Sequence, residues 1–197
     1  LRRFDYDSCE VIVRINSVDT EFWTKDLDEI IPFLPDMIMP PKTNSEDDVR
    51  LVSQYIGTLE EKYGMKKNSV KLIPLIETAM GVENAYRIAS AGERVAAIFL
   101  GAEDLSADLR CKRTKEGTEI LYSRQRLVVA ARAAGVDVYD TPFTDVNDDE
   151  GIRKDASFAK ALGFTGKASI SPRHIDAINE AFSPTQADIK YAHEVMN

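Results

Sequence analysis

VKLIPLIETAMG, from Val70 to Gly81, is followed along the chain by VAAIFLGAEDL, from Val95 to Leu105. Each of these stretches opens with a short apolar run and then turns polar, which is typical of a buried parallel strand that ends at its carboxyl edge. The residues between them, from Val82 to Ala91, have the amphipathic pattern of a helix. The two stretches therefore predict a strand–helix–strand unit with parallel strands.

The same alternation continues along most of the chain. Further strands are predicted at CEVIVRI from Cys9, DMIM from Asp36, VDVYD from Val136 and GKASIS from Gly166. Further helices are expected over residues 47–62, 117–134, 148–162 and 173–181, several of them introduced by the Asn, Asp or Ser that an N-cap favours. Repeated units of this kind give either a doubly wound sheet or a (β/α)₈ barrel.

Polar residues after almost every predicted strand favour the barrel, because reactive side chains in a barrel project from the C-terminal ends of several strands. Those ends here carry Arg14, Pro41 with Lys42, Glu77, Glu103 with Asp104, Asp140 and Ser171. The phosphate-binding patterns GxGxxG and GxxxxGK[ST] are absent from the sequence. We therefore predict an α/β protein with one TIM-barrel domain over residues 1–197.

The strand count suggests that this barrel is partial. The pattern yields about six strands, whereas a closed barrel has eight, and the chain opens on Leu1 and enters its first strand almost at once. We expect the first two βα units to be absent from this chain.

Composition limits the classes of partner. The formal net charge is -8 and the basic residues are dispersed, so nucleic acid or an anionic membrane would be repelled. No apolar run approaches the roughly 20 residues that span a bilayer. Cys9 and Cys111 lie far apart without a metal-ligand spacing, and we expect both to be packing or surface thiols. These features predict a soluble, cytoplasmic protein.

Two predicted strand ends carry carboxylates that could share one metal ion. Glu77 ends one strand, and Glu103 and Asp104 follow the next. Neighbouring strands lie about 4.8 Å apart, and two carboxylates with room for water and substrate oxygens suit Mg²⁺. The alternative is that Glu77 pairs with an arginine from a neighbouring strand and that Asp104 caps the following helix. The adjacency of the two strand ends favours the metal.

Basic residues near the same strand ends could bind an anionic substrate. Arg14 interrupts an apolar strand, so its guanidinium either reaches solvent or points into the mouth of the barrel, where it could hold a carboxylate in two places. Lys42 follows two prolines and either adds positive potential there or is a solvated surface lysine. His174 and His193 are expected to be ordinary surface or core histidines, and Trp23 to pack a helix.

A series of motifs resembles a known family. These motifs are VRINS (13–17), MPPK (39–42), LIETAMGVENA (75–85), LGAEDLSADL (100–109), KEGTEILYSR (115–124), AARAAG (130–135), DTPFTDVNDDEG (140–151) and LGFTGKASISPRHI (162–175). In this order they resemble the citrate lyase beta-subunit family, within the aldolase/citrate lyase superfamily of TIM barrels. The likeness covers essentially the whole chain.

The resemblance implies a mechanism and a set of site residues. It implies that Glu77 and Asp104 ligate Mg²⁺, that Arg14 and Glu77 contact the substrate as catalytic residues, and that the backbone amides of Gly101 and Ala102 meet its carboxylate. The implied substrate is a citryl thioester on acyl carrier protein, or on coenzyme A in relatives, cleaved to oxaloacetate and an acetyl thioester. Ser171 stands in an Ile-Ser-Pro sequence where the family usually has Ile-Asn-Pro, so this position departs from the family pattern.

Two alternatives stay open beside this reading. A malyl-coenzyme A lyase or malate synthase-like enzyme would use the same metal site on a different thioester. A noncatalytic assembly subunit would keep only a docking surface, although retention of Arg14, Glu77 and Asp104 argues against it. The resemblance also implies a homo-oligomer, such as a trimer, or a subunit of a larger citrate lyase complex.

Overall fold

The computed structural model describes residues 9–196, which fall into two compact units. The first unit extends to Thr141 and the second begins at Pro142. All the candidate site residues, Arg14, Glu77, Gly101, Ala102 and Asp104, belong to the first unit. Each unit is described below by itself.

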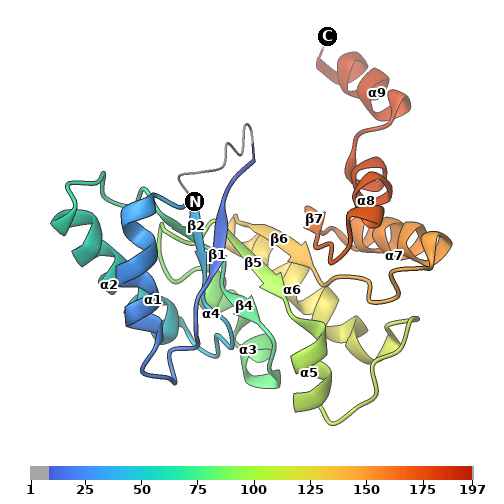
Figure 1. Ribbon diagram of the computed structural model, residues 1–197. Helices are drawn as coiled ribbons and strands as arrows, with labels where there is room; N and C mark the ends of the chain where they lie inside the picture. Colours follow the sequence, from blue (N-terminus) through green and yellow to red (C-terminus); the bar gives the residue numbers. More distant parts are fainter. Residues whose placement is uncertain (1–8, 197) are drawn as a thin grey trace. The chain divides into compact units, whose positions relative to one another are not determined.

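The first unit alternates strands and helices, as the sequence predicts (Figure 1). Its strands are β1 (Ile12–Arg14), β2 (Met37–Met39), β3 (Lys71–Leu72), β4 (Leu75–Ile76), β5 (Ala97–Leu100) and β6 (Asp137–Asp140). Its α-helices are α1 (Trp23–Ile30), α2 (Glu46–Lys62), α3 (Ala79–Glu83), α4 (Ala85–Ala89), α5 (Ala102–Asp108) and α6 (Leu121–Ala134), and 3₁₀ turns occur at Ile31–Phe33 and Thr118–Ile120.

Every pairing between these strands is parallel. β1 pairs with β2 and β2 with β3, while β4 pairs with β5 and β5 with β6. A bridge from Leu72 to Val95 and a hydrogen bond from Ile73 N to Ile38 O continue the pairing past the break between β3 and β4. The predicted α/β fold with parallel strands is therefore confirmed, and closure into a barrel stays a prediction.

The predicted strand VKLIPLI is divided into β3 and β4 at Pro74. Proline lacks the amide hydrogen that a ladder needs, and the structure places it between the two short strands. The predicted helix over residues 82–91 is likewise two short helices, α3 and α4, which meet at Asn84.

Both faces of the strands contribute buried residues. Ile38, Leu72, Ile98 and Val138 are fully buried, as expected for the face of a parallel sheet that helices cover. The neighbouring positions Met37, Ile73 and Ala97 form a separate buried cluster, with Met39, Phe99 and Tyr139 partly exposed against it. The first unit therefore buries both faces of its strands, one more completely than the other.

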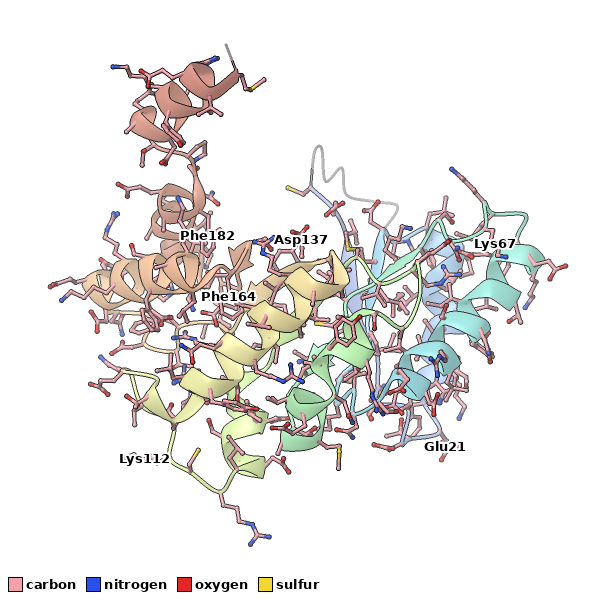
Figure 2. The ribbon with its side chains drawn as sticks, turned by 180° about the vertical axis from the view of Figure 1, so that it is seen from behind. Glu21, Lys67, Lys112, Asp137, Phe164 and Phe182 are labelled. Carbon is pink, nitrogen blue, oxygen red and sulfur yellow. The ribbon has the colours of Figure 1, made fainter. Side chains whose placement is uncertain are left out.

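Loops that follow strands gather at one end of the first unit. Figure 2 shows Glu21, from the loop after β1, and Lys112, from the loop after α5, at one end. Lys67, which precedes β3, and Asp137, which begins β6, lie at the other end. Since parallel strands all point the same way, their carboxyl ends bring distant parts of the sequence together.

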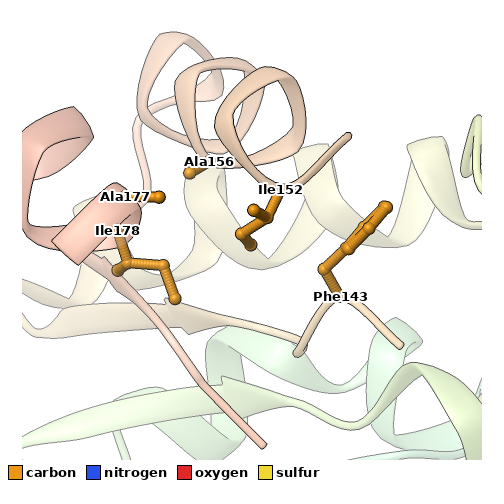
Figure 3. Packing of buried hydrophobic residues seen from close by; sticks show 5 residues of the cluster. All are labelled: Phe143, Ile152, Ala156, Ala177 and Ile178. Carbon is orange, nitrogen blue, oxygen red and sulfur yellow. The ribbon is translucent and has the colours of Figure 1, made fainter. Parts of the chain in front are cut away.

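The second unit is mainly helical. It contains α7 (Asp149–Leu162), β7 (Gly166–Lys167), a 3₁₀ turn (Pro172–His174), α8 (Ile175–Phe182) and α9 (Gln186–Met196). Phe143, Ile152, Ala156, Ala177 and Ile178 form its apolar core between α7 and α8 (Figure 3). Among the described residues, no helix combines the length and apolar character that crossing a membrane requires.

Candidate functional site

Four side chains of the site follow four different strands of the first unit. Arg14 is the last residue of β1, Lys42 lies in the loop after β2, Glu77 directly follows β4, and Asp104 lies in the first turn of α5, after β5. Because these strands are parallel neighbours, their ends meet at one edge. The structure therefore brings together the arginine and the two carboxylates that the sequence singled out.

Glu77 is the buried member of this group, with 7% of its surface exposed. Its Oε1 accepts a hydrogen bond of 2.9 Å from the backbone N–H of Lys42. Burial raises the pKa of the Glu77 carboxyl and the charge of Asp104 raises it further, while the Lys42 amide and the charges of Lys42 and Arg14 oppose this rise in pKa. Glu77 therefore senses all three of the other side chains.

Asp104 and Lys42 form an open ion pair. The Lys42 Nζ lies 3.8 Å from the Asp104 Oδ2, and 53% and 57% of the two side chains are exposed. Since both groups are this accessible, their attraction is modest, and either could turn to another partner.

The loop after β2 is fixed to β4, which explains how the Lys42 amide reaches Glu77. Leu75 N donates to Pro40 O at 2.9 Å, and Thr43 N donates to Leu75 O at 3.1 Å. Lys42 lies between these two bonds with φ of 49°, in the left-handed region that non-glycine residues rarely adopt. A strained backbone held on both sides is common at functional sites.

Further hydrogen bonds join the same loop to the start of α3. Thr78 caps α3, and its hydroxyl donates to the Asn44 Oδ1. The Asn84 side-chain amide donates to Asn44 O at 2.8 Å, and Ala79 N donates to the Asp108 Oδ2 at 2.7 Å. The segments that carry Lys42, Glu77 and Asp104 are therefore linked by hydrogen bonds that do not involve the side chains of Glu77 and Asp104.

Gly101 and Ala102 lie against Glu77, but their amides bond within the chain. Gly101 N donates to Ile76 O at 2.9 Å, and Ala102 N donates to the Thr141 Oγ1 at 3.2 Å. A Cβ on Gly101 would come within 2.8 Å of both Cβ and Oε2 of Glu77. The glycine therefore leaves space for the carboxylate, whereas contact of these two amides with a substrate stays a prediction.

The alternative structural roles, an arginine pair for Glu77 and a helix cap for Asp104, find little support among the described residues. Glu77 accepts a hydrogen bond from the backbone amide of Lys42, not from an arginine. The N-cap of α5 is Gly101, and no side chain makes a cap hydrogen bond there. Arg14 is exposed at the end of β1 and close enough to lower the pKa of Glu77.

Three other residues that follow predicted strands or lie near them have different roles. Asp140 is buried and receives two hydrogen bonds from Arg124, at 3.0 and 2.9 Å. In the second unit, Ser171 caps the 3₁₀ turn by accepting from Arg173 N, and His174 is fully buried beside Phe143. The sequence does not predict the Arg124–Asp140 pair, because an arginine in a helix carries no signal for a partner in the next strand.

The chemistry of the donor set suits a hard divalent cation. Within residues 9–196, no group of three or more His, Cys, Asp or Glu side chains could hold a metal. Glu77 and Asp104 together could offer two carboxylate donors. Mg²⁺ is commonly bound through one or two carboxylates, with water or substrate oxygens completing its shell. The residues present fit such an ion.

Known proteins are similar to this chain over most of its length. Residues 1–172 match the family model described as HpcH/HpaI aldolase/citrate lyase. The chain is 38% identical over 191 residues to citrate lyase subunit beta of Haemophilus influenzae, covering 97% of this chain and 66% of that protein. It is 34% identical over 206 residues to mitochondrial citramalyl-CoA lyase of Mus musculus, covering 100% of this chain and 61% of that protein.

A solved structure is similar as well. The citrate lyase beta subunit from M. tuberculosis, complexed with oxaloacetate and magnesium, has a TM-score of 0.73 and 29% identity, covering 88% of this chain and 73% of that chain. The present chain thus spans less than two thirds of the length of the two curated relatives.

Proposed function

The chain belongs to the HpcH/HpaI aldolase/citrate lyase family, and from this premise we propose that it carries the metal site of a magnesium-dependent carbon–carbon lyase. Glu77 and Asp104 hold Mg²⁺, and Arg14 binds a carboxylate of the substrate. The observation that carries the proposal is the meeting of a buried carboxylate, a second carboxylate and two cations at four parallel strand ends.

The burial of Glu77 supports a metal rather than a purely structural role. A buried carboxylate beside another carboxylate is costly unless a cation compensates it. The rise in the pKa of Glu77 reflects this cost. A divalent cation held by Glu77 and Asp104 would offset this cost.

The reaction needs negative charge to be stabilised at two stages. The substrate hydroxyl loses its proton as the carbon–carbon bond breaks, its oxygen becomes the ketone of the oxo-acid, and the bonding electrons move to the thioester as an enolate that is then protonated. Mg²⁺ supplies Lewis-acid stabilisation of developing oxygen charge. Arg14 contributes a planar fork that fixes a substrate carboxylate and so orients the bond that breaks.

The substrate we propose is a citryl thioester on acyl carrier protein, cleaved to oxaloacetate and an acetyl thioester. The similarity to citrate lyase subunit beta and the oxaloacetate-bound relative support this choice. A citramalyl-CoA substrate is the second candidate, favoured by the similarity to the mouse enzyme over the full length of this chain. Parallel cleavage assays with citryl and citramalyl thioesters in the whole protein distinguish the two.

The arrangement of the strands supports a barrel as the frame for this site. The strands of the first unit follow one another in sequence order, all parallel, as in a (β/α)₈ barrel. We propose that the chain is part of one, and that the whole protein is a homo-oligomer, such as a trimer, or a citrate lyase complex subunit. Gly101 and Ala102 would line the substrate pocket through their backbone.

The metal assignment is tested by a double-variant cycle. Glu77→Gln and Asp104→Asn each remove one anionic ligand at nearly constant size, so each is expected to weaken Mg²⁺ binding and abolish turnover. Their effects should be far from additive, because the first change already destroys the shared site. Calorimetric titration of Mg²⁺ into both single variants and the double variant measures this directly.

Glu103→Gln is the matched control, since Glu103 is an exposed carboxylate adjacent to Asp104 that pairs instead with Arg113. It should keep the Mg²⁺ affinity of the unaltered protein. Unaltered metal affinity in Glu77→Gln or Asp104→Asn would remove that residue from the metal site and, with it, the proposed function.

A further inference from the structure

Lys42 contacts both proposed metal ligands through two different groups. Its backbone N–H donates to the Glu77 Oε1 at 2.9 Å, and its side-chain Nζ lies 3.8 Å from the Asp104 Oδ2. The residue is held in a left-handed conformation, with φ of 49°, by the two hydrogen bonds between Leu75 and the flanking Pro40 and Thr43. One strained residue therefore touches both carboxylates of the site.

Without a metal, this site places two like charges close together. Glu77 is buried and its pKa is raised by burial and by Asp104, so the empty site carries an electrostatic cost. The Lys42 ammonium offsets part of this cost, and the Arg14 guanidinium offsets a smaller part. Of these two cations, Lys42 is the one whose side chain forms an ion pair with Asp104.

We propose that the Lys42 ammonium is an internal counter-ion that neutralises Asp104 in the metal-free protein and gives up this contact when a divalent cation binds. The inference rests on the proposed metal site and adds a residue to it. Mg²⁺ lies about 2.1 Å from its oxygen ligands, so it competes with the ammonium for the same carboxylate and repels its charge.

The side chain can make this movement. More than half of Lys42 is exposed, and a flexible four-carbon stem carries its charge. The backbone amide stays fixed by the loop, so Glu77 keeps its hydrogen bond while the ammonium leaves Asp104. Lys42 would thus stabilise the empty site, lower its affinity for the metal and keep metal binding reversible.

Lys42→Met tests the proposal, because it removes the ammonium and keeps the backbone amide. Calorimetric titration should show Mg²⁺ binding about two- to fivefold more tightly, the range expected for loss of an exposed ion pair. The metal-free variant should melt at a lower temperature than the unaltered protein, and saturating Mg²⁺ should raise its melting temperature by a larger increment. Lys42→Arg, which keeps the charge, should return both readouts toward the unaltered values.

Lys25→Met is the matched control. Lys25 forms a similarly exposed ion pair with Glu21, at 3.5 Å, so the change removes the same charge from a pair outside the site and should leave Mg²⁺ affinity unaltered. Lys42→Asn is a second test variant, since asparagine tolerates the left-handed backbone and removes the ammonium without adding apolar surface.

The outcomes separate this inference from the proposed function. Mg²⁺ affinity that stays unaltered or falls in folded Lys42→Met and Lys42→Asn, with Glu77→Gln still weakening Mg²⁺ binding, overturns the counter-ion role alone. An unaltered protein that binds no Mg²⁺ overturns the proposed function and the inference together. If Lys25→Met binds Mg²⁺ as much more tightly as Lys42→Met does, the counter-ion role is also overturned, because the change in net charge would then explain the effect.

Discussion

Glu77 owes its position to backbone that approaches it from two sides. The Lys42 amide binds its Oε1, and Gly101 comes so close that any Cβ there would overlap the carboxylate and also lie 3.1 Å from the Leu75 side chain. The φ of Gly101 is an ordinary -100°, so the requirement for glycine is one of space, not of backbone conformation.

We therefore expect Gly101→Ala to displace the Glu77 carboxylate. Overpacking of this kind costs about 1–3 kcal/mol, and Mg²⁺ affinity should fall by about tenfold or more if the carboxylate moves to relieve it. Gly57→Ala is the control, because a Cβ there meets its nearest atom, on Arg94, at 3.9 Å. Calorimetry on both variants decides the matter, and a Gly101→Ala protein with unaltered Mg²⁺ affinity would contradict the close-packing argument.

Arg14 should matter to the substrate rather than to the metal. Arg14→Lys keeps the charge but loses the planar fork, so oxaloacetate binding in the presence of Mg²⁺ should weaken by about 1.5–3 kcal/mol. Arg50→Lys, on the exposed face of α2, is the control and should not change the affinity. If Arg14→Lys binds oxaloacetate as the unaltered protein does, Arg14 lies outside the substrate site.

The positions of the two carboxylates at neighbouring strand ends could be predicted from the sequence, whereas the backbone that surrounds them could not. Glu77 and Asp104 each follow an apolar strand, and parallel strands bring such residues together. The left-handed backbone of Lys42 depends on the hydrogen bonds that its neighbours Pro40 and Thr43 make with Leu75, 33 residues from Lys42 (75 − 42), and no local sequence pattern indicates it. From the sequence alone, Lys42 can therefore be interpreted either as a surface lysine or as a site residue.

At the level of elements, the periodicity of the sequence predicted the order of strands and helices, but not the points at which single elements are interrupted. All six predicted strands are present, but the one from Val70 is split at Pro74, and the helix from Val82 is broken at Asn84. Proline and capping residues act locally against a regular pattern, so a period read over a longer window overlooks them.

A buried ion pair joins α2 to the segment before β5, and no local sequence pattern indicates it. Arg94 donates to the Glu60 Oε1 and Oε2 at 2.8 and 2.9 Å, and also to Val70 O and the Ser53 hydroxyl. Burial alone would raise the pKa of Glu60, but the hydrogen bonds from Arg94 and from the amides of Val70 and Asn68 outweigh it and lower the pKa from 4.5 to about 2.

This lowered pKa predicts a loss of stability in acid. A carboxyl whose pKa is lower in the folded state stabilises the fold above its unfolded pKa, and that contribution disappears as the pH falls from 4.5 toward 2. The shift corresponds to about 3 kcal/mol at neutral pH. Glu60→Gln should lower the free energy of unfolding by about 3–5 kcal/mol at pH 7, and this deficit should be about 2 kcal/mol smaller at pH 3.

Urea unfolding of the unaltered protein and the variant between pH 7 and pH 3 measures this difference. Glu61→Gln is the control, since Glu61 is the exposed neighbour on the same helix, and it should change the unfolding free energy little at any pH. A Glu60→Gln deficit that stays constant down to pH 3 would show that ionisation of Glu60 does not stabilise the fold.

At the level of the whole molecule, the sheet of the first unit has an edge at β1. Within residues 9–196, β1 is the terminal strand of the order β1-β2-β3, and Ile12 in it is 41% exposed. An edge strand leaves a row of amide and carbonyl groups unpaired, and an apolar edge is a template for pairing with another chain. The net charge of -8 opposes such association only in a general way.

We expect the 197-residue chain to associate through this edge, and Ile12→Lys to reduce the association, because lysine on an edge strand disfavours pairing with a second strand. Val129→Lys is the control: Val129 lies on α6 and is more exposed, at 62%, so it adds the same charge and removes a similar apolar side chain away from any strand edge. Sedimentation velocity over a range of protein concentrations compares the three proteins, and added salt should strengthen association where charge repulsion limits it.

If Val129→Lys reduces self-association as much as Ile12→Lys does, then general charge, and not the β1 edge, controls self-association. An unaltered chain that stays purely monomeric would show that the edge is already protected.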